Sequence, residues 1–203
     1  EKEEPGAWGG IHICGKAHTN AEGGKGSSEI GGAVYGGNDD ADNSGTLQYI
    51  RLEYTGFAFD EEHEANGISF YGVGNGTIVD HCEAYKGSDD GFEFFGGSVN
   101  VSNMVVVSCS DDSFDWTEGW NGKGTDLVAY QEAKATLGYD CDCLIEADNN
   151  ENDNAATPVS HPVLKNLILA GNGESKQGIR LRRGTQADID NAKVLPVLAH
   201  HNE

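Results

Sequence analysis

The sequence predicts an all-β solenoid, a parallel β-helix. Three observations support this: an internal repeat, two short apolar strands in each copy, and linkers too short to hold a helix. The three central copies follow one another after 24 and then 22 residues; they are Gly67-Ile68-Ser69-Phe70, Gly91-Phe92-Glu93-Phe94 and Ser113-Phe114-Asp115-Trp116. Each copy leads to a second apolar segment; these are Thr77-Ile78-Val79, Met104-Val105-Val106-Val107 and Leu127-Val128-Ala129. A unit this short cannot bury its apolar face alone, so the copies must stack on one another.

A single domain accounts for the whole chain. The 203 residues accommodate one solenoid of about seven to nine coils, so residues 1–203 are expected to form one unit. The 29 glycines follow no G-X-Y period, which excludes collagen. The longest apolar runs fall far short of the roughly 20 residues of a membrane-spanning helix, so no span is expected. The chain opens at Glu1 without an initiator Met, as a mature portion or fragment of a longer secreted protein would.

The formal net charge is −21, from 34 acidic and 13 basic residues. Nucleic acids and anionic membrane surfaces carry the same sign, so the charge argues against both as partners. Secretion, binding of divalent cations and simple solubility are all compatible with it.

The N-terminal third contains alternating segments separated by polar loops. Residues 6–15 read as a strand with glycines at both ends, in which His12 points away from its apolar neighbours and is solvated or hydrogen-bonded rather than a ligand. Residues 18–32 read as a loop, 33–37 as a short strand and 38–45 as an acidic loop. Residues 47–54 read as a half-buried strand with an interruption.

The C-terminal third repeats this pattern after a polar excursion at residues 131–140. Strands are expected at 143–146, 163–169, 178–184 and 189–194, with a polar, Asn-rich loop at 148–157. The tail from Leu195 shows no periodicity, and no helix longer than one or two turns is expected.

Stacking the first-strand segments predicts one outward and two inward columns. The outward column is Ser69, Glu93, Asp115, Glu146 and Arg180. The inward ones are Ile68, Phe92, Phe114, Ile145 and Ile179, with Phe70, Phe94, Trp116 and Leu181 beside them. Stacked strands lie about 4.7–4.9 Å apart, so Glu93 and Asp115 repel each other unless water, a cation or a donor lies between them. Glu146 and Arg180 should attract.

The five cysteines are an odd number without a C-x-x-C pair. Cys141 and Cys143 are too close in sequence for a relaxed bridge, and Cys109 aligns with Gly87 rather than with Cys82. We expect buried, unpaired thiols.

Paired aspartates suggest a metal site. Asp89 and Asp90 recur one coil later as Asp111 and Asp112, and carboxylates gathered at one corner raise one another's proton affinity unless a cation neutralises them. Calcium suits such a corner because it takes six to eight oxygen ligands in irregular geometry.

The acidic loop that begins at Asp40 offers a second calcium candidate through Asp40 and Asp42. Its twelfth position is Arg51, which excludes an EF-hand. For all six aspartates the alternative is turn chemistry, in which Asp bonds its own backbone.

Several motifs resemble one family. They are Trp8-Gly9-Gly10-Ile11-His12-Ile13-Cys14-Gly15-Lys16-Ala17, Tyr35-Gly36-Gly37-Asn38-Asp39, Asp42-Asn43-Ser44-Gly45-Thr46-Leu47, Ser88-Asp89-Asp90-Gly91-Phe92-Glu93-Phe94-Phe95-Gly96-Gly97 and Ile179-Arg180-Leu181-Arg182-Arg183. They are similar to motifs of large secreted proteins of Bacteroidetes-type bacteria. The resemblance implies a right-handed parallel β-helix, a surface-attached or secreted location, further coils upstream, and in most cases no assigned activity.

An enzymatic alternative starts from Ser88–Gly91 and Gly178–Leu181, which superficially resemble acid and substrate-binding motifs of polygalacturonase-like enzymes. The Gly-His-Gly element of those enzymes is missing, Arg180 lies 90 residues after Asp90, and a −21 surface repels polyuronates. We therefore assign no catalytic and no organic-cofactor residues. A module that binds neutral glycans through Trp116, Trp120 or Tyr71 is a further alternative, although its column position places Trp116 in the core.

The sequence thus predicts a non-catalytic, structural or adhesive β-helix of an extracellular bacterial surface, stabilised by calcium. Polysaccharide cleavage and glycan binding are the alternatives. No amphipathic helix is available to cover either end of the solenoid, so two alternatives follow: further coils of a longer protein cover the ends, or another copy of the chain does. The second alternative predicts self-association end to end into filaments, with lateral contacts through Asn149–Asn152.

Overall fold

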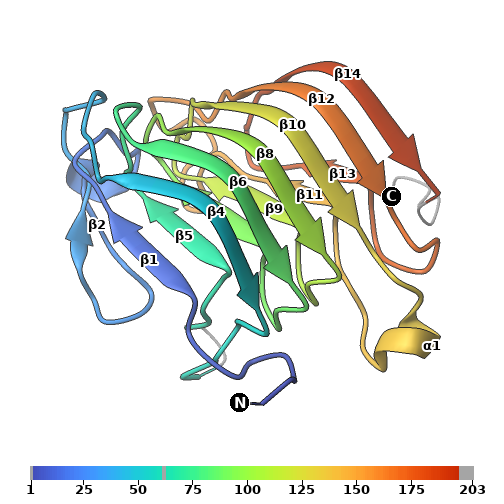
Figure 1. The fold of residues 1–203 in the computed structure, drawn as a ribbon. Coiled ribbons are helices and arrows are strands. Elements are labelled where there is room, and N and C mark those ends of the chain that lie inside the picture. Colours follow the sequence, from blue (N-terminus) through green and yellow to red (C-terminus); the bar gives the residue numbers. More distant parts are fainter. Residues whose placement is uncertain (1, 61–62, 197–203) are drawn as a thin grey trace.

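The computed structural model describes residues 2–60 and 63–196 and shows two six-stranded parallel sheets wound into one right-handed solenoid (Figure 1). Sheet 1 consists of β1 (Ile11–Cys14), β5 (Ile68–Tyr71), β7 (Phe92–Phe95), β9 (Phe114–Thr117), β11 (Ile145–Ala147) and β13 (Ile179–Leu181). Sheet 2 consists of β4 (Thr46–Glu53), β6 (Ile78–Tyr85), β8 (Asn100–Val107), β10 (Lys123–Tyr130), β12 (Val163–Ala170) and β14 (Asp188–Leu195). The predicted parallel β-helix is confirmed.

The described strands make about six coils rather than the seven to nine expected. The difference comes from long excursions that leave the solenoid between β1 and β4, between β10 and β11, and between β11 and β12. The first excursion carries a 3-10 turn, η1 (Glu22–Gly24), and an antiparallel pair, β2 (Gly26–Ser27) with β3 (Val34–Tyr35). The second carries the single-turn helix α1 (Lys134–Leu137). No described helix is long and apolar enough to cross a membrane.

The strand register confirms the predicted columns. Ile68 lies beside Phe92, Phe92 beside Phe114, and Phe114 beside Ile145, and the first three of these side chains are almost fully buried. In the neighbouring column the rings of Phe70 and Phe94 stack at 5.0 Å between centroids. Such ring contacts stabilise the solenoid by about 0.5–1.5 kcal/mol beyond the area they bury.

The aromatic side chains proposed above as glycan platforms are buried. Trp116, Trp120 and Tyr71 are at most 1% exposed, and the indole of Trp120 stacks on Phe94 at 4.0 Å. A platform must present a ring face to solvent, so none of the three serves as one, and Trp116 is buried as its column position predicts.

Each strand of sheet 2 is eight residues long and bends at its fourth residue. That residue has a positive φ in all six strands; the residues are Tyr49, His81, Asn103, Asp126, Asn166 and Asn191. Asn and Asp tolerate the left-handed region better than most residues, and here Asn166 donates to Asp126 and Asn191 donates to Asn166, both at 2.8 Å. The bend breaks the alternation, which explains the predicted interruption at residues 47–54 and leaves Tyr49 76% exposed.

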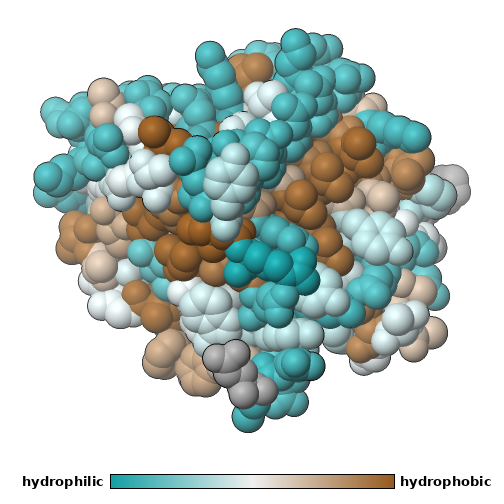
Figure 2. Space-filling view, viewed as in Figure 1, coloured by the Kyte–Doolittle hydropathy of each residue, from teal (hydrophilic) through white to brown (hydrophobic). Residues whose placement is uncertain are grey.

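The outward face of sheet 2 carries a band of apolar residues (Figure 2). Ile78, Val163 and Ile168 are each more than two-fifths exposed there. All five cysteines are free, as expected; four are buried, and Cys14 is exposed.

Candidate cation-binding groove

A groove runs along the outward face of sheet 1. It consists of two adjoining pockets of about 370 and about 330 Å³, and both are lined by Glu29, Glu93, Asp115 and Arg182. Its floor contains the predicted outward column. The strand register confirms that the members of this column are neighbours on successive strands; they are Ser69, Glu93, Asp115, Glu146 and Arg180.

The paired aspartates lie at the corner through which the chain enters sheet 1. One pair, Asp89-Asp90, comes just before β7, and the other, Asp111-Asp112, comes just before β9. The N–H of Gly91 donates to the carbonyl of Asp112 at 2.9 Å, which joins the two coils at this corner. A Cβ at Gly91 would lie 2.6 Å from the carbonyl oxygen of Ser113 and 2.6 Å from Cγ1 of Val106. Glycine therefore lets successive coils approach closely, and this approach places the two aspartate pairs one above the other.

The four predicted aspartates lie close together in the folded chain. Carboxylate oxygens of Asp89, Asp90 and Asp111 lie within 4.8 Å of one another, and a second such group joins Asp111 and Asp112 to Asp142. Asp90 Oδ1 accepts a hydrogen bond from the N–H of Asp112 at 2.9 Å, and Asp112 Oδ1 accepts one from the N–H of Cys143 at 2.5 Å. Backbone donors thus fix the orientation of both carboxylates toward the groove.

Glu93 and Asp115 extend this cluster along the floor of the groove. A third group brings carboxylate oxygens of Asp90, Glu93 and Asp115 within 4.8 Å of one another. Asn66 Nδ2 donates to Glu93 Oε2 at 2.7 Å, whereas Asp115 Oδ1 is buried and has no hydrogen-bond partner in the part of the chain that the structure describes.

Burial and mutual repulsion make these carboxyls weak acids. Burial, with smaller contributions from Glu64 and Asp111, raises the pKa of Asp89 to about 7. Burial and the nearby Asp115 raise the pKa of Asp112 to about 9, and burial with Asp142 raises that of Asp111 to about 6. The pKa values of Asp90, Glu93 and Asp115 also lie well above their usual range because of burial and then of neighbouring carboxylates. Near neutral pH the groove therefore favours either bound protons or bound cations.

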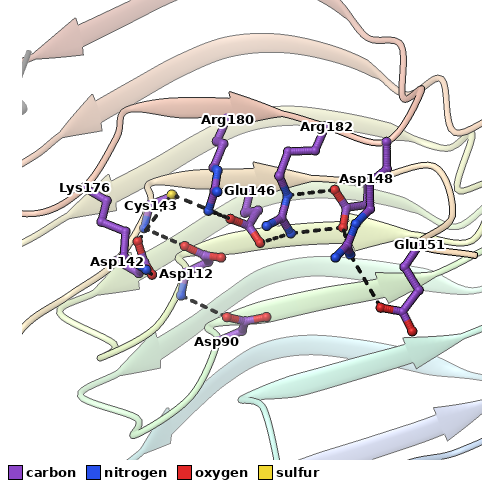
Figure 3. A network of polar contacts seen from close by, with 11 residues as sticks. Asp90, Asp112, Asp142, Cys143, Glu146, Asp148, Glu151, Lys176, Arg180 and Arg182 are labelled. Atoms are coloured by element: carbon purple, nitrogen blue, oxygen red, sulfur yellow. Dashed lines mark hydrogen bonds and ion pairs between the residues drawn. The ribbon is translucent and has the colours of Figure 1, made fainter. Parts of the chain in front are cut away.

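Basic side chains occupy the other end of the groove (Figure 3). Lys176 pairs with Asp142, and Arg180 Nη1 donates to Glu146 Oε1 at 2.8 Å, as predicted. Arg182 contacts both Glu146 and Asp148. The side chain of Glu146 is only 12% exposed, whereas those of Arg180 and Lys176 are 36% and 62% exposed, so the carboxylate of the Glu146–Arg180 pair is more deeply buried than the basic side chains.

The walls of the groove come from the long excursions. Tyr35, from β3, donates its hydroxyl to Glu118 Oε2 at 2.8 Å, and Tyr71 donates to Glu29 Oε2 at 3.4 Å. On the opposite wall, Asn149 is fully buried and accepts from Asn20 Nδ2 at 2.9 Å, while Asn150 Nδ2 donates to Asn20 Oδ1 at 3.0 Å. Asn149 and Asn150 therefore bond within the chain, which leaves the exposed Glu151 and Asn152 as the outer part of the predicted lateral contact.

Asp40 and Asp42 lie outside the acidic cluster. Asp40 Oδ1 accepts from the ring Nδ1 of His18 at 2.5 Å, and Asp42 Oδ2 accepts from Ser44 Oγ at 3.0 Å. Within the described residues neither carboxylate belongs to a group that could hold a metal. Asp42 therefore bonds within its own loop, as in a turn, whereas Asp40 bonds a residue 22 positions earlier.

Glu29 and Glu64 also line the groove, and nothing in the sequence pattern indicated them. Both stand on irregular segments outside the repeat, so only the folded chain brings them there. Asp142 could have been found, because it occupies the same place in its coil as Asp111 does one coil earlier.

Fold and groove define a right-handed parallel β-helix protein with a carboxylate-lined cleft on one sheet. The chain belongs to the pectate-lyase-like β-helix domain family, whose model matches residues 1–198. No match to the chain is found among curated proteins or among solved structures.

Proposed function

We propose that this domain is a calcium-stabilised, non-catalytic β-helix of an extracellular structural or adhesive protein of the bacterial surface. The observation that carries the proposal is the excess of carboxylates in the groove. The second pocket is lined by ten acidic and three basic residues; they are Glu29, Glu64, Asp89, Asp90, Glu93, Asp111, Asp112, Asp115, Asp142 and Glu146, against Lys176, Arg180 and Arg182. A hard divalent cation with oxygen ligands is the counterion that such a set favours.

Calcium held between coils would stabilise the contact between successive coils. Its ligands come from consecutive coils, so binding requires the folded stack and stabilises it over the unfolded chain. At a calcium concentration 100 times the dissociation constant, the gain in unfolding free energy is about 2.7 kcal/mol.

Thermal unfolding of the chain with chelator and with calcium tests this proposal. We expect chelation to lower the midpoint and calcium to restore it, whereas sodium chloride at matched ionic strength should not. A midpoint that responds to neither chelator nor calcium would contradict the proposal.

Polysaccharide cleavage is the second candidate function, favoured by the family and by carboxyls whose raised pKa values suit proton transfer near neutral pH. Asp90 and Arg180 also line the same pocket despite their separation in sequence. The test is an assay of the chain against neutral and acidic polysaccharides, with Asp115→Asn as the comparison. Product formed by the parent chain and lost in the variant would favour this candidate over the first.

End-to-end self-association is a further part of the proposal. Within the described residues β13 and β14 pair on one edge only, and the inward-facing Leu181 and Val194 are 49% and 44% exposed there. A following copy would cover them with β1 and β4. Continuing the register would then place Arg51 beside Lys193, and these two positive charges would repel each other unless salt screens them. Association should therefore strengthen with salt, and light scattering that reports a monomer at all concentrations and salt levels would refute it.

A further inference from the structure

The floor of the groove changes charge from coil to coil in a regular way. Extending the register of sheet 1 two and three residues upstream of each strand gives two aligned columns, which join the outward column within the strands to make three. From the coil of β5 to that of β13 they are Ala65, Asp89, Asp111, Asp142 and Lys176; Asn66, Asp90, Asp112, Cys143 and Gln177; and Ser69, Glu93, Asp115, Glu146 and Arg180. In these columns the β5 coil is neutral and the β7 and β9 coils carry only carboxylates. The β11 coil carries two carboxylates and a cysteine, and the β13 coil carries two basic side chains and an amide.

The basic coil neutralises only the coil next to it. Lys176 pairs with Asp142, and Arg180 and Arg182 pair with Glu146. Within the described part of the chain, none of the six carboxylates of the β7 and β9 coils forms an ion pair. Those six are Asp89, Asp90, Glu93, Asp111, Asp112 and Asp115.

Two buried oxygens at this place favour a cation as their partner. Among the described residues, Asp115 Oδ1 is buried without a hydrogen-bond partner, and so is Oδ1 of Asn66, a residue only 1% exposed whose Nδ2 donates to Glu93. Buried polar atoms in folded proteins nearly always have a partner, because leaving one unsatisfied costs free energy. A bound cation supplies that partner for the carboxylate.

The distances fit calcium. Calcium–oxygen bonds are about 2.3–2.6 Å, so oxygens on opposite sides of one ion lie roughly 4.6–5.2 Å apart. Two of the carboxylate groups that lie within 4.8 Å consist only of residues without an ion pair: Asp89 with Asp90 and Asp111, and Asp90 with Glu93 and Asp115. The other two groups include Asp142 or Glu146, whose charges are already matched by Lys176 and the arginines.

We propose that the β7 and β9 coils hold two calcium ions bridged by Asp90. One lies among Asp89, Asp90 and Asp111, and the other among Asp90, Glu93 and Asp115. This inference rests on the proposed function and deepens it: calcium binds in pairs, between two particular coils, and the basic coil ends the row because Lys176 and Arg180 take the places that further ions would need.

Calorimetric titration of calcium into the chelator-treated chain at pH 8 tests the stoichiometry. We expect two ions per chain. Asp115→Asn should weaken one of the two sites at least tenfold and leave the other, whereas Asp90→Asn should weaken both. Asp142→Asn is the matched control, a carboxylate in the same groove that pairs with Lys176, and it should keep both ions.

Circular dichroism of each variant confirms folding, and if Asp90→Asn does not fold, the comparison of Asp115→Asn with Asp142→Asn still decides. A single ion in the parent chain would overturn the paired site and leave calcium stabilisation intact. Loss of an ion in Asp142→Asn but not in Asp115→Asn would also overturn it. Absence of any calcium binding would remove the proposed function as well.

Discussion

Raising the pH should destabilise the calcium-free protein. Asp89 has an ordinary pKa of 3.8, and burial in the groove raises it to about 7. Because the folded value is the higher one, the folded state holds this proton more tightly than the unfolded chain does. The resulting stabilisation is complete below about pH 4 and is lost as the pH rises through about 7.

The size of the effect follows from the two pKa values. For Asp89 alone, a change from pH 5 to pH 8 lowers the unfolding free energy by about 2.5 kcal/mol. Asp111 and Asp112, with pKa values raised to about 6 and about 9, act in the same direction. Bound calcium should oppose this trend, because it competes with protons for the same oxygens and binds more tightly as the pH rises.

Urea denaturation followed by circular dichroism, in chelator and at several pH values, measures the trend. We expect stability to fall between pH 5 and pH 8 in chelator and to depend less on pH in calcium. Asp89→Asn should flatten the fall, whereas Glu22→Gln, which alters an exposed carboxylate outside the groove, should not. Stability that stays constant or rises with pH in chelator would refute the electrostatic reasoning.

Three further outcomes are expected. Phe92→Ala and Phe114→Ala should each cost about 3–5 kcal/mol in urea denaturation, because both side chains fill one buried column, whereas Tyr49→Ala on the exposed bend should cost much less. Gly91→Ala should lower the thermal midpoint through its contacts at 2.6 Å, while Gly9→Ala, whose added Cβ would lie 3.9 Å from its nearest neighbour, should be tolerated; equal midpoints would contradict the packing of that corner. A thiol reagent should modify Cys14 in the native protein and all five cysteines after unfolding, and rapid modification of several native thiols would show that the core around Cys109 and Cys143 is open.

The sequence by itself determined the solenoid and the two sides of sheet 1. The repeat that includes Phe92 and Phe114 fixes which side chains stack, because in a parallel β-helix the register of one coil sets that of the next. It also brought Asp89 and Asp90 beside Asp111 and Asp112, since equivalent positions in successive coils are neighbours in space.

Only the tertiary structure decided what surrounds those aspartates. Glu29 and Glu64 reach the groove on irregular segments that follow no period, so their sequence carries no signal of the contact. The sequence likewise could not separate Asp40, held by His18, from Asp90, since both stand in acidic stretches. Glu146 is matched by Arg180, whereas Asp115 Oδ1 has no hydrogen-bond partner among the described residues. This difference depends on side-chain positions that only the folding of successive coils sets.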